Sequence, residues 1–401
     1  MIILVLGTLS LVSPFAVDMY LPAFSLVAAQ FHTNTAAISL SLSSYFIGFA
    51  LGQIFYGPLL DRFGRKPPLT AGLLLYIAAS LGCIHPDDLN TLVALRFVQA
   101  LGGCVAQVSA VAMVRDFFRS EESARVFSLV FLVIGVSPLL APSIGSLVML
   151  SLGWYWIFVL LAVFAAAILS VVLLFLPEPH VPDHGISLHP ARLFRTYMHV
   201  WQQPQFVTYA LAGAFSFSGL FSYVAGSPII FMDGYHVSAQ TFGAMFAVLT
   251  GGFIAGSQLN VFLLRRFSSS RIFSTALAVQ VVTGIFFVAG TELHRLTMVP
   301  VLVLFFVFLS CIGLTYPNAA AIALAPFSRN VGSASALLGF VQMGTGAIMS
   351  TGIGVFGARA VTLSLAITAL VSFLVLHIGK RFVPESEIAA ADEEKVLAVA
   401  H

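Results

Sequence analysis

Long uninterrupted apolar stretches, separated by short polar connections, follow one another along almost the whole chain. A helix needs about 20 apolar residues to cross the hydrocarbon core of a bilayer, and twelve segments come close to that length. They are residues 2–24, 37–60, 68–85, 91–113, 123–148, 154–176, 205–231, 239–263, 271–290, 298–325, 332–356 and 361–382. The pattern predicts an all-α membrane protein with twelve transmembrane helices.

One connection is much longer than the others and divides the apolar segments into two groups of six. We expect an N-terminal six-helix bundle over 1–176, a cytoplasmic linker with an interfacial helical part over 177–204, a C-terminal bundle over 205–382 and a cytoplasmic tail over 383–401. The stretch GFALGQIFYGPLLDRFGRK in the first group weakly matches GFIAGSQLNVFLLRRFSSSR in the second. This match favours two pseudo-symmetric bundles, as in transporters built from parallel repeats.

Composition supports this prediction and excludes several classes of protein. The 401 residues are 59% hydrophobic and 8% charged, with a mean hydropathy of +1.01, whereas soluble domains carry about 25% charged residues. The net charge of +2 is too small to indicate a nucleic-acid partner. The three cysteines lie in apolar segments at unrelated spacings, so they predict neither disulfides nor a metal site, and we expect no cofactor.

The positions of lysine and arginine predict the orientation in the membrane, because these residues concentrate on the cytoplasmic side. Fifteen lie in connections after even-numbered segments or in the tail: Arg62, Arg65, Lys66, Arg115, Arg119, Arg125, Arg192, Arg195, Arg265, Arg266, Arg271, Arg329, Lys380, Arg381 and Lys395. Only Arg295 and Arg359 lie on the opposite side. We therefore expect both termini and the linker in the cytoplasm. The opening segment lacks a basic start and is too long for a signal peptide, so it predicts a first transmembrane helix, with a short preceding leader missing or absent.

Asp18 is the first candidate for a chemical role, because it is the one charged residue in the opening apolar segment. A charge at mid-bilayer costs roughly 2.5–3.5 kcal/mol on insertion scales. Chains keep such residues mainly where a proton or an ion is handled. The alternative is a neutral, hydrogen-bonded carboxyl that only holds helices together.

Arg96 in the fourth segment is the only basic residue that lies well inside a predicted span, away from its ends, and Gln99 follows it by one helical turn. At 1.5 Å per residue, Asp18 lies about 24 Å from the inner end of its helix and Arg96 about 8 Å from the outer end of its own. Both depths fall in the outer half of the membrane, so an ion pair or an alternating partnership is possible. The alternative for Arg96 is a side chain that reaches the outer surface.

The connection after the second segment runs GPLLDRFGRK from Gly57 to Lys66. Gly57 would let a neighbouring helix approach closely, Gly64 permits a tight turn, and Asp61 is placed to accept from the exposed N–H groups that begin the 332–356 helix. An ordinary cytoplasmic loop explains the basic residues but not Asp61 or the glycine spacing. The pattern resembles the signature loop of the major facilitator superfamily.

Asp116 follows Arg115 at the cytoplasmic end of the fourth segment. It can face the basic loop, and Arg65 is its expected partner. Together with Arg62 these charges would form a cytoplasmic gate that locks in one state and opens in another. The alternative is an inert surface pair, because exposed pairs contribute little.

Gly135, Pro138, Pro142 and Gly145 recur at spacings of three, four and three along the fifth segment. They therefore share one helix face, which would be bendable and closely packed. This stripe resembles the antiporter motif of drug–proton exchangers in the same superfamily.

Further motifs resemble a narrower group, the bicyclomycin/chloramphenicol resistance (Bcr/CflA) subfamily of drug:proton antiporters. They are DMYLPAF at 18–24, GQIFYGPLLDRFGRKP at 52–67, MVRDFF at 113–118, SPLLAPSIGSL at 137–147 and GAFSFSGLFSYVAGSP at 213–228, the last closest to its bicyclomycin branch. The similarity extends along nearly the full length. It implies the major facilitator fold with twelve helices, alternating access, and efflux of small antimicrobial drugs driven by proton entry. From the residues themselves we expect Asp18 and Arg96 to couple the proton, and we expect the protein in the inner membrane of a bacterium.

A mostly apolar cavity with a few polar groups would suit such substrates. Its expected residues, besides Asp18 and Arg96, are Tyr45, Gln53, Gln99, Phe217, Phe221, Tyr316, Asn318 and Gln342. For the phenylalanines, packing or lipid contact is an equally open interpretation. We expect the protein to act as a monomer in the lipid bilayer, with a drug and protons as its partners.

Other functions stay open on the sequence alone. A membrane enzyme is disfavoured, because no span carries a metal-ligand cluster, a nucleophile motif or a phosphate-binding glycine loop. A scaffold or sensor would not need Asp18 and Arg96 buried. Within transport, the rivals are an exporter of a metabolite such as an amino acid or short peptide, and an inward proton symporter.

Overall fold

Helices make up nearly all of the described structure, a computed structural model that covers residues 2–118, 120–178, 182–183, 189–293, 296–327 and 331–383. In chain order they are α1 (Ile2–Asp18), η1 (Leu21–Ala23), α2 (Phe24–Gln30), α3 (Thr35–Phe63), α4 (Lys66–Gly82), α5 (Leu89–Phe117), α6 (Ser120–Leu152), α7 (Tyr155–Phe175), α8 (Pro190–Trp201), α9 (Pro204–Pro228), η2 (Ile229–Gly234), α10 (Ala239–Leu263), α11 (Ser269–Glu292), α12 (Met298–Leu324), α13 (Val331–Phe356), α14 (Ala358–Gly379) and η3 (Lys380–Phe382). The tail 384–401 lies outside the description, as do Arg119, Arg295, Arg329 and Lys395, which the orientation argument used.

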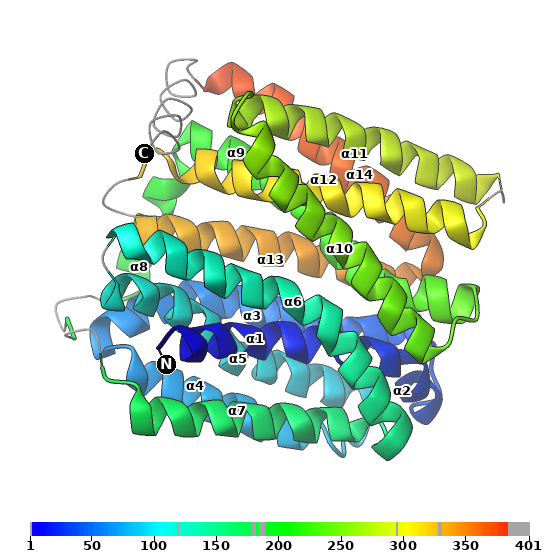
Figure 1. Ribbon diagram of the computed structural model, residues 1–401, viewed down its shortest axis with the longest axis horizontal. Helices are drawn as coiled ribbons and strands as arrows, with labels where there is room; N and C mark the ends of the chain where they lie inside the picture. The colour runs from blue at the N-terminus through cyan, green and yellow to red at the C-terminus, as the bar shows by residue number, and fades with distance from the viewer. Residues whose placement is uncertain are drawn as a thin grey trace. The chain divides into compact units, whose positions relative to one another are not determined.

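The predicted spans are confirmed as helices. Among the described residues, eleven helical stretches are long and apolar enough to cross a membrane. The remaining predicted span is α4, which has 17 residues. The protein is therefore a multi-pass membrane protein, and its long helices run side by side within each unit (Figure 1).

The chain divides into two compact units. The first holds Met1–Leu193 with Ser227–Ala247, and the second holds Phe194–Gly226 with Val248–His401. The sequence placed 227–247 in the C-terminal bundle, whereas the division groups it with the first unit. The domain boundaries at 176 and 205 stay a prediction.

Side-chain caps mark where several spans begin. Asn34 accepts a hydrogen bond from the N–H of Ala37 at 2.8 Å at the start of α3. Asp88 accepts one from Thr91 at 2.6 Å at the start of α5. Each cap satisfies an amide that the helix itself leaves unpaired, so polar residues between apolar segments set the helix starts.

Glycines let the helices of the first unit approach closely around α5. A Cβ at Gly48 of α3 would lie 2.5 Å from the carbonyl oxygen of Phe97, and one at Gly52 would lie 2.8 Å from the Cβ of Cys104. On the other side, a Cβ at Gly102 of α5 would lie 2.5 Å from the backbone nitrogen of Tyr76 in α4. Such close backbone packing replaces the hydrophobic effect as the force between helices in lipid, and it fixes α5 between α3 and α4.

The first span is interrupted, which the sequence prediction of one helix over 2–24 missed. α1 ends at Asp18, a short 3-10 turn begins at Leu21, and α2 continues to Gln30. Pro22 explains the break, because proline has no N–H to donate to the carbonyl four residues earlier and its ring clashes there. That carbonyl belongs to Asp18, so the acid lies at the interruption of the helix.

Candidate functional site

Arg96 is the largest fully buried side chain of the first unit, with 0% of its surface exposed. Its guanidinium lies among three aromatic rings, 4.5 Å from the centroid of Tyr45, 5.1 Å from that of Tyr20 and 5.7 Å from that of Phe158. Ring faces attract a cation electrostatically. Arg96 therefore does not reach toward the outer surface, and the structure rules out that alternative.

Hydrogen bonds fix the orientation of the guanidinium. Nη1 donates to Oε1 of Gln99 at 2.6 Å, and Nη2 donates to the carbonyl of Ala16 at 2.9 Å. Gln99 in turn donates to the hydroxyl of Ser80 at 2.7 Å. We call Arg96, Gln99, Ser80 and the Ala16 carbonyl the Arg96 cluster. It joins α1, α4 and α5, and the sequence missed Ser80 because one serine in an apolar helix gives no signal.

One nitrogen of Arg96 is left without a partner. Its Nε is buried and has no hydrogen-bond partner, and the same holds for the hydroxyls of Ser13 and Tyr45. A buried donor without a partner costs about 1–3 kcal/mol. The cluster can therefore accommodate one more hydrogen-bond acceptor.

Asp18 lies beside this cluster, two residues after Ala16, with 6% of its surface exposed. No ion pair joins it to Arg96 among those that the described residues form. The Ala16 carbonyl and Gln99 occupy two of the donors that such a pair would use. Arg96 thus contacts the backbone of α1 two residues before Asp18, and an ion pair between the two side chains stays a prediction for another state.

The glycine stripe of α6 packs against the break that follows Asp18. Gly145 lies so close to the carbonyl of Met19 that a Cβ there would overlap the Met19 backbone. Pro142 is buried one turn earlier, and Gly135 and Pro138 are half-buried on the same helix. The motif helix is therefore in direct backbone contact with Met19, the residue that follows the acid.

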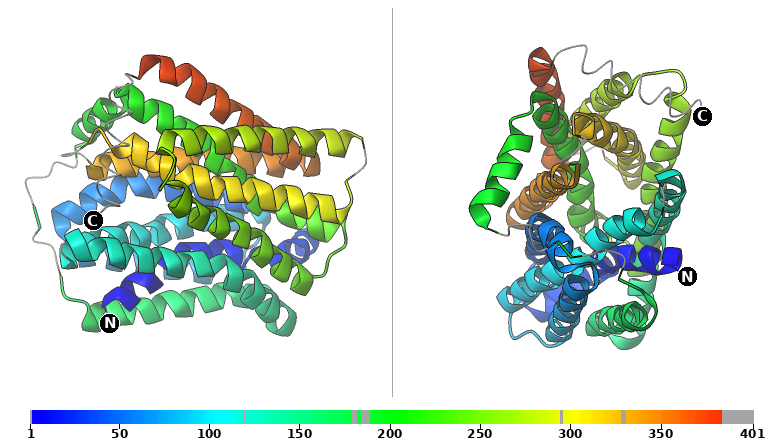
Figure 2. Two further views of the ribbon diagram at one scale, coloured as in Figure 1. Left: turned by 45° about the horizontal axis from the view of Figure 1, so that its top comes forward. Right: turned by 90° about the vertical axis from the view of Figure 1, so that its left-hand side faces the viewer.

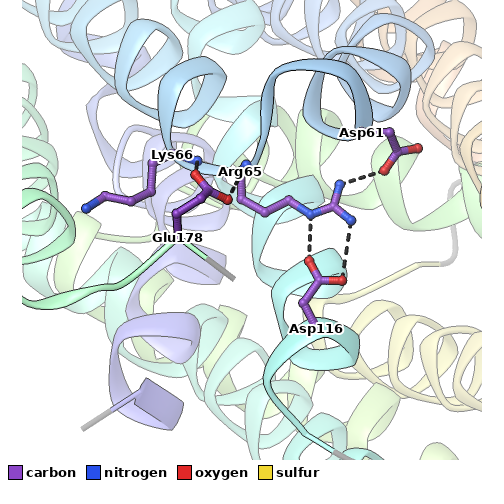
Figure 3. A network of polar contacts seen from close by, with 5 residues as sticks. All are labelled: Asp61, Arg65, Lys66, Asp116 and Glu178. Atoms are coloured by element: carbon purple, nitrogen blue, oxygen red, sulfur yellow. Dashed lines mark hydrogen bonds and ion pairs between the residues drawn. The ribbon is translucent and has the colours of Figure 1, made fainter. Parts of the chain in front are cut away.

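At the far end of the same unit, Arg65 joins two carboxylates (Figure 3). Its Nε donates to Asp116 at 2.6 Å and its Nη1 donates to Asp61 at 2.6 Å. Burial lowers the pKa of Arg65, but the hydrogen bonds that Arg65 donates to Asp116 and Asp61 outweigh this effect, so its pKa is raised overall. The predicted partnership of Arg65 and Asp116 is present.

Glu178 completes this group, and the sequence analysis missed it. Its carboxylate accepts from the backbone N–H groups of Arg65 and Lys66, both at 2.8 Å (Figure 3). It thereby caps the first turn of α4, where negative charge is favoured. A signal was present, because Glu178 directly follows the last apolar residues of the sixth span. We call Asp61, Arg65, Asp116 and Glu178 the Arg65 cluster.

Gly64 turns the chain between α3 and α4 with a φ of +86°, which glycine adopts most easily. A Cβ here would lie 3.1 Å from the carboxyl carbon of Glu178. Gly57, in contrast, has no atom of the described structure within 4 Å of a Cβ position, so the close approach expected there is absent. Arg62 lies over the ring of Phe63 at 5.7 Å. The contact of Asp61 with the start of α13 stays a prediction.

In the second unit, the predicted aromatic residues meet. Phe217 stacks on Tyr316 with a centroid distance of 4.6 Å, and Phe221 meets Phe217 edge-on at 5.3 Å. Phe217 and Tyr316 are half-buried. The group offers flat apolar surface, which suits either packing or a planar ligand.

The polar residues predicted for the cavity have different surroundings. Asn318 is fully buried and donates to Asn260 at 2.6 Å, which holds α12 to α10. Gln342 is buried with its amide nitrogen unpartnered, and Gln53 is half-buried on α3, about 12 Å along the helix from Tyr45. A single cavity shared by all these residues stays a prediction.

The second unit has its own buried polar group, which the sequence analysis did not identify. The hydroxyl of Ser216 donates to Gln280 at 2.8 Å and lies 2.7 Å from that of Thr315. We call these three residues the Gln280 cluster. It joins α9, α11 and α12, and all three side chains are uncharged.

The family model of the Major Facilitator Superfamily matches residues 6–350. The chain belongs to the major facilitator superfamily. This agrees with the signature loop that holds Arg65 and with the helical architecture.

Curated members of the superfamily match most of the chain. A bicyclomycin resistance protein homolog from Haemophilus influenzae is 32% identical over 349 residues, 87% of each chain. An uncharacterised transporter of this superfamily from Bacillus subtilis, YdgK, is 30% identical over 92% of each chain. The multidrug resistance protein MdtL of Escherichia coli is 27% identical over 96% of each chain. The expected resemblance to bicyclomycin resistance proteins is confirmed.

Solved superfamily structures share the fold. A D-xylose–proton symporter matches with a TM-score of 0.76 at 14% identity, covering 96% of this chain and 98% of its own. A bacterial homolog of the lysosomal transporter Spinster matches with a TM-score of 0.70 at 13% identity, covering 98% and 96%. The predicted fold, twelve transmembrane helices in two pseudo-symmetric bundles, is confirmed, and the protein is a membrane transporter.

Proposed function

We propose that this transporter exports small, mostly apolar antimicrobial compounds in exchange for protons, by alternating access. The observation that carries the proposal is the fully buried Arg96, which donates to the backbone of α1 two residues before the buried acid Asp18. Two relatives over most of the chain are named as bicyclomycin resistance and multidrug resistance proteins. Their names supply the substrate class, and the buried acid supplies the coupling.

The exchange would proceed at Asp18. An ionised carboxylate out of water is costly, so Asp18 holds a proton while Arg96 is bonded to Ala16 and Gln99. When the proton leaves, the carboxylate becomes the acceptor that the unpartnered Nε of Arg96 lacks. Drug binding would favour this deprotonated state, because a ligand shifts an equilibrium only through different affinities for its two states.

The Arg65 cluster would act as the cytoplasmic gate. Its bonds join the ends of α3 and α5 to the start of α4. If they break when the cytoplasmic side opens, the two carboxylates and the arginine return to water together. Each hydrogen bond of the cluster is charge-assisted. The cluster therefore stabilises the state in which it is intact more strongly than neutral hydrogen bonds would.

The location and assembly follow from the same reasoning. The bias of lysine and arginine supports both termini in the cytoplasm, and the relatives are bacterial, which supports the inner membrane. One chain carries both units, so we propose that the monomer is the working form.

Transport by the purified protein in vesicles tests the proposal. We expect wild-type protein to move bicyclomycin or an amphenicol uphill when a pH gradient is imposed. Asp18→Asn, which keeps the shape and removes the titrating group, should lose uphill transport but still equilibrate drug down its own gradient. Uphill transport by Asp18→Asn at the wild-type rate would exclude Asp18 as the coupling acid. Transport of an amino acid or short peptide in place of these drugs would instead revise the substrate class.

A further inference from the structure

The helix α8, which follows the first unit in the chain, sorts its residues onto three sides. At 3.6 residues per turn, positions three, four and seven apart share a side. Leu193, Tyr197 and Val200 form the first side, Phe194, Met198 and Trp201 the second, and Arg192, Arg195 and His199 the third. Two adjacent sides are therefore apolar and the third is basic.

The first apolar side packs on the second unit. Val200 is 0% exposed and belongs to the core that contains Phe206 and Tyr209 of α9. Tyr197 and Trp201 pack against the same core. This contact fixes α8 to the start of α9 and explains one of its two apolar sides.

Phe194 and Met198, the part of the second apolar side that precedes Trp201, are not among the residues that form or pack against this core. Phe194 is 62% exposed, and Met198, one turn later, is half-buried. Together they place an apolar strip directly beside the basic side, an arrangement typical of a helix that lies in the membrane interface.

The direction of α8 indicates that the membrane surface covers Phe194 and Met198. In the right-hand view of Figure 2, the spanning helices of the second unit are seen end-on and α8 is seen lengthwise, so α8 runs across their direction. It ends at Trp201, and α9 enters the membrane from Pro204. The helix therefore lies at the level where the lipid headgroups begin, parallel to the membrane plane.

The charge of α8 identifies the lipids. Its residues include Arg192, Arg195 and His199 but no aspartate or glutamate. A helix in the membrane interface with arginines on its polar side attracts anionic headgroups. We propose that α8 is a lipid-binding helix, which inserts Phe194 and Met198 between anionic lipids and places its arginines against their phosphates.

Spin labels at two positions of the full-length protein test the insertion. Phe194→Cys reports the proposed lipid side and His199→Cys, an exposed position on the basic side, is the matched control. The native cysteines Cys83, Cys104 and Cys311 are all buried, so labelling is directed to the introduced thiol. The protein is reconstituted in bilayers of zwitterionic lipid alone or with one-third phosphatidylglycerol, and accessibility to oxygen and to a water-soluble nickel complex is measured.

We expect the label at 194 to be oxygen-accessible and shielded from nickel in the anionic membrane, and the label at 199 to show the reverse. Arg195→Gln in the Phe194→Cys protein should weaken this anionic-lipid effect roughly fivefold, the contribution expected of one basic residue at such a surface. Equal nickel access at 194 and 199 would overturn the proposal. So would shielding at 194 that appears only at high protein density, which indicates a second copy of the chain, or shielding that is the same without anionic lipid.

Discussion

The two units each contain a buried polar cluster on corresponding helices, yet only one of them is charged. The Arg96 cluster joins the first, third and fourth spans of its unit, and the Gln280 cluster joins the same three spans of the other. Both would hold their helices together, because hydrogen bonds between spans contribute about 0.6–2 kcal/mol each. Only the first adds a guanidinium and a neighbouring carboxyl, which structural bonding does not require.

This difference between the clusters indicates which unit couples transport to the proton. A neutral cluster fulfils the structural role in the second unit at lower electrostatic cost. The charged version in the first unit is explained if Asp18 and Arg96 exchange partners when a proton binds or leaves. The comparison therefore assigns proton coupling to the first unit. Matched substitutions in the two units can test this assignment.

The largest expected effect comes from Arg96→Met compared with Gln280→Met. Methionine fills a similar volume without a charge, so each change removes the hydrogen bonds of its cluster. We expect uphill drug transport to fall at least a hundredfold for Arg96→Met and less than threefold for Gln280→Met, per folded molecule, measured in vesicles with a pH gradient. Equal losses would contradict the assignment of coupling to the first unit.

Each unit also has a glycine that packs directly on a carbonyl oxygen, and substitution of these two glycines tests the same difference between the units. Gly145 packs on Met19 beside Asp18, and Gly256 packs on Ser310 in the second unit. Alanine at either position must displace backbone, so we expect both variants to lose about 1–3 kcal/mol of stability, seen as a lower melting temperature in detergent. Only Gly145→Ala should also reduce transport per folded molecule, by about tenfold.

Gly352→Ala provides the control for these two variants, since no described atom lies within 4 Å of a Cβ at Gly352. It should melt at or slightly above the wild-type temperature. If Gly256→Ala impaired transport as strongly as Gly145→Ala, the special role of the α6 contact with Asp18 would be lost.

The loops that follow the second span of each unit, which we propose to be cytoplasmic, differ in the same way. Arg65 is buried between two carboxylates, whereas Arg265 in the corresponding loop is exposed and lies over the ring of Phe262. Arg65→Gln should cost about 2 kcal/mol of stability, because charged hydrogen bonds are lost, and should slow turnover three- to tenfold with drug affinity unchanged. Arg265→Gln should change stability and turnover only slightly, because an exposed charge contributes little. A fall in affinity equal to the fall in turnover would argue against a gate.

The smallest effect is expected for the serines at the edges of the clusters. Ser80→Ala removes the acceptor that orients Gln99, and Ser216→Ala removes the partner of Gln280 and Thr315. Each should cost about 1 kcal/mol of stability. Ser80→Ala alone should displace the pH dependence of transport, by loosening the orientation of Arg96, and rates measured between pH 5 and pH 8 would detect it.

Much of this arrangement is predictable from the sequence, because apolar length and periodicity directly determine which segments span a membrane. The partnership of Arg65 with Asp116 was also predictable, since each lies at the cytoplasmic end of a neighbouring span. The depths of Asp18 and Arg96 along antiparallel helices predicted that both lie in the same half of the membrane, but not whether Arg96 is buried. These are features of one or two elements at a time.

The parts that the sequence did not predict depend on tertiary packing. Whether Arg96 donates to Asp18 or to the Ala16 carbonyl depends on a helix break that Pro22 causes. The capping role of Glu178 depends on where a linker returns to α4. The Gln280 cluster joins three helices far apart in the chain, and single serines and threonines in apolar spans usually bond only to their own helix.

Proton release on drug binding tests the central claim most directly. Purified protein in weakly buffered detergent solution near neutral pH is mixed with saturating drug, and a pH indicator records the protons set free. The account predicts release from wild-type protein and none from Asp18→Asn, although both bind drug. Release from Asp18→Asn equal to that from wild type would contradict it, because the proton would then come from another group.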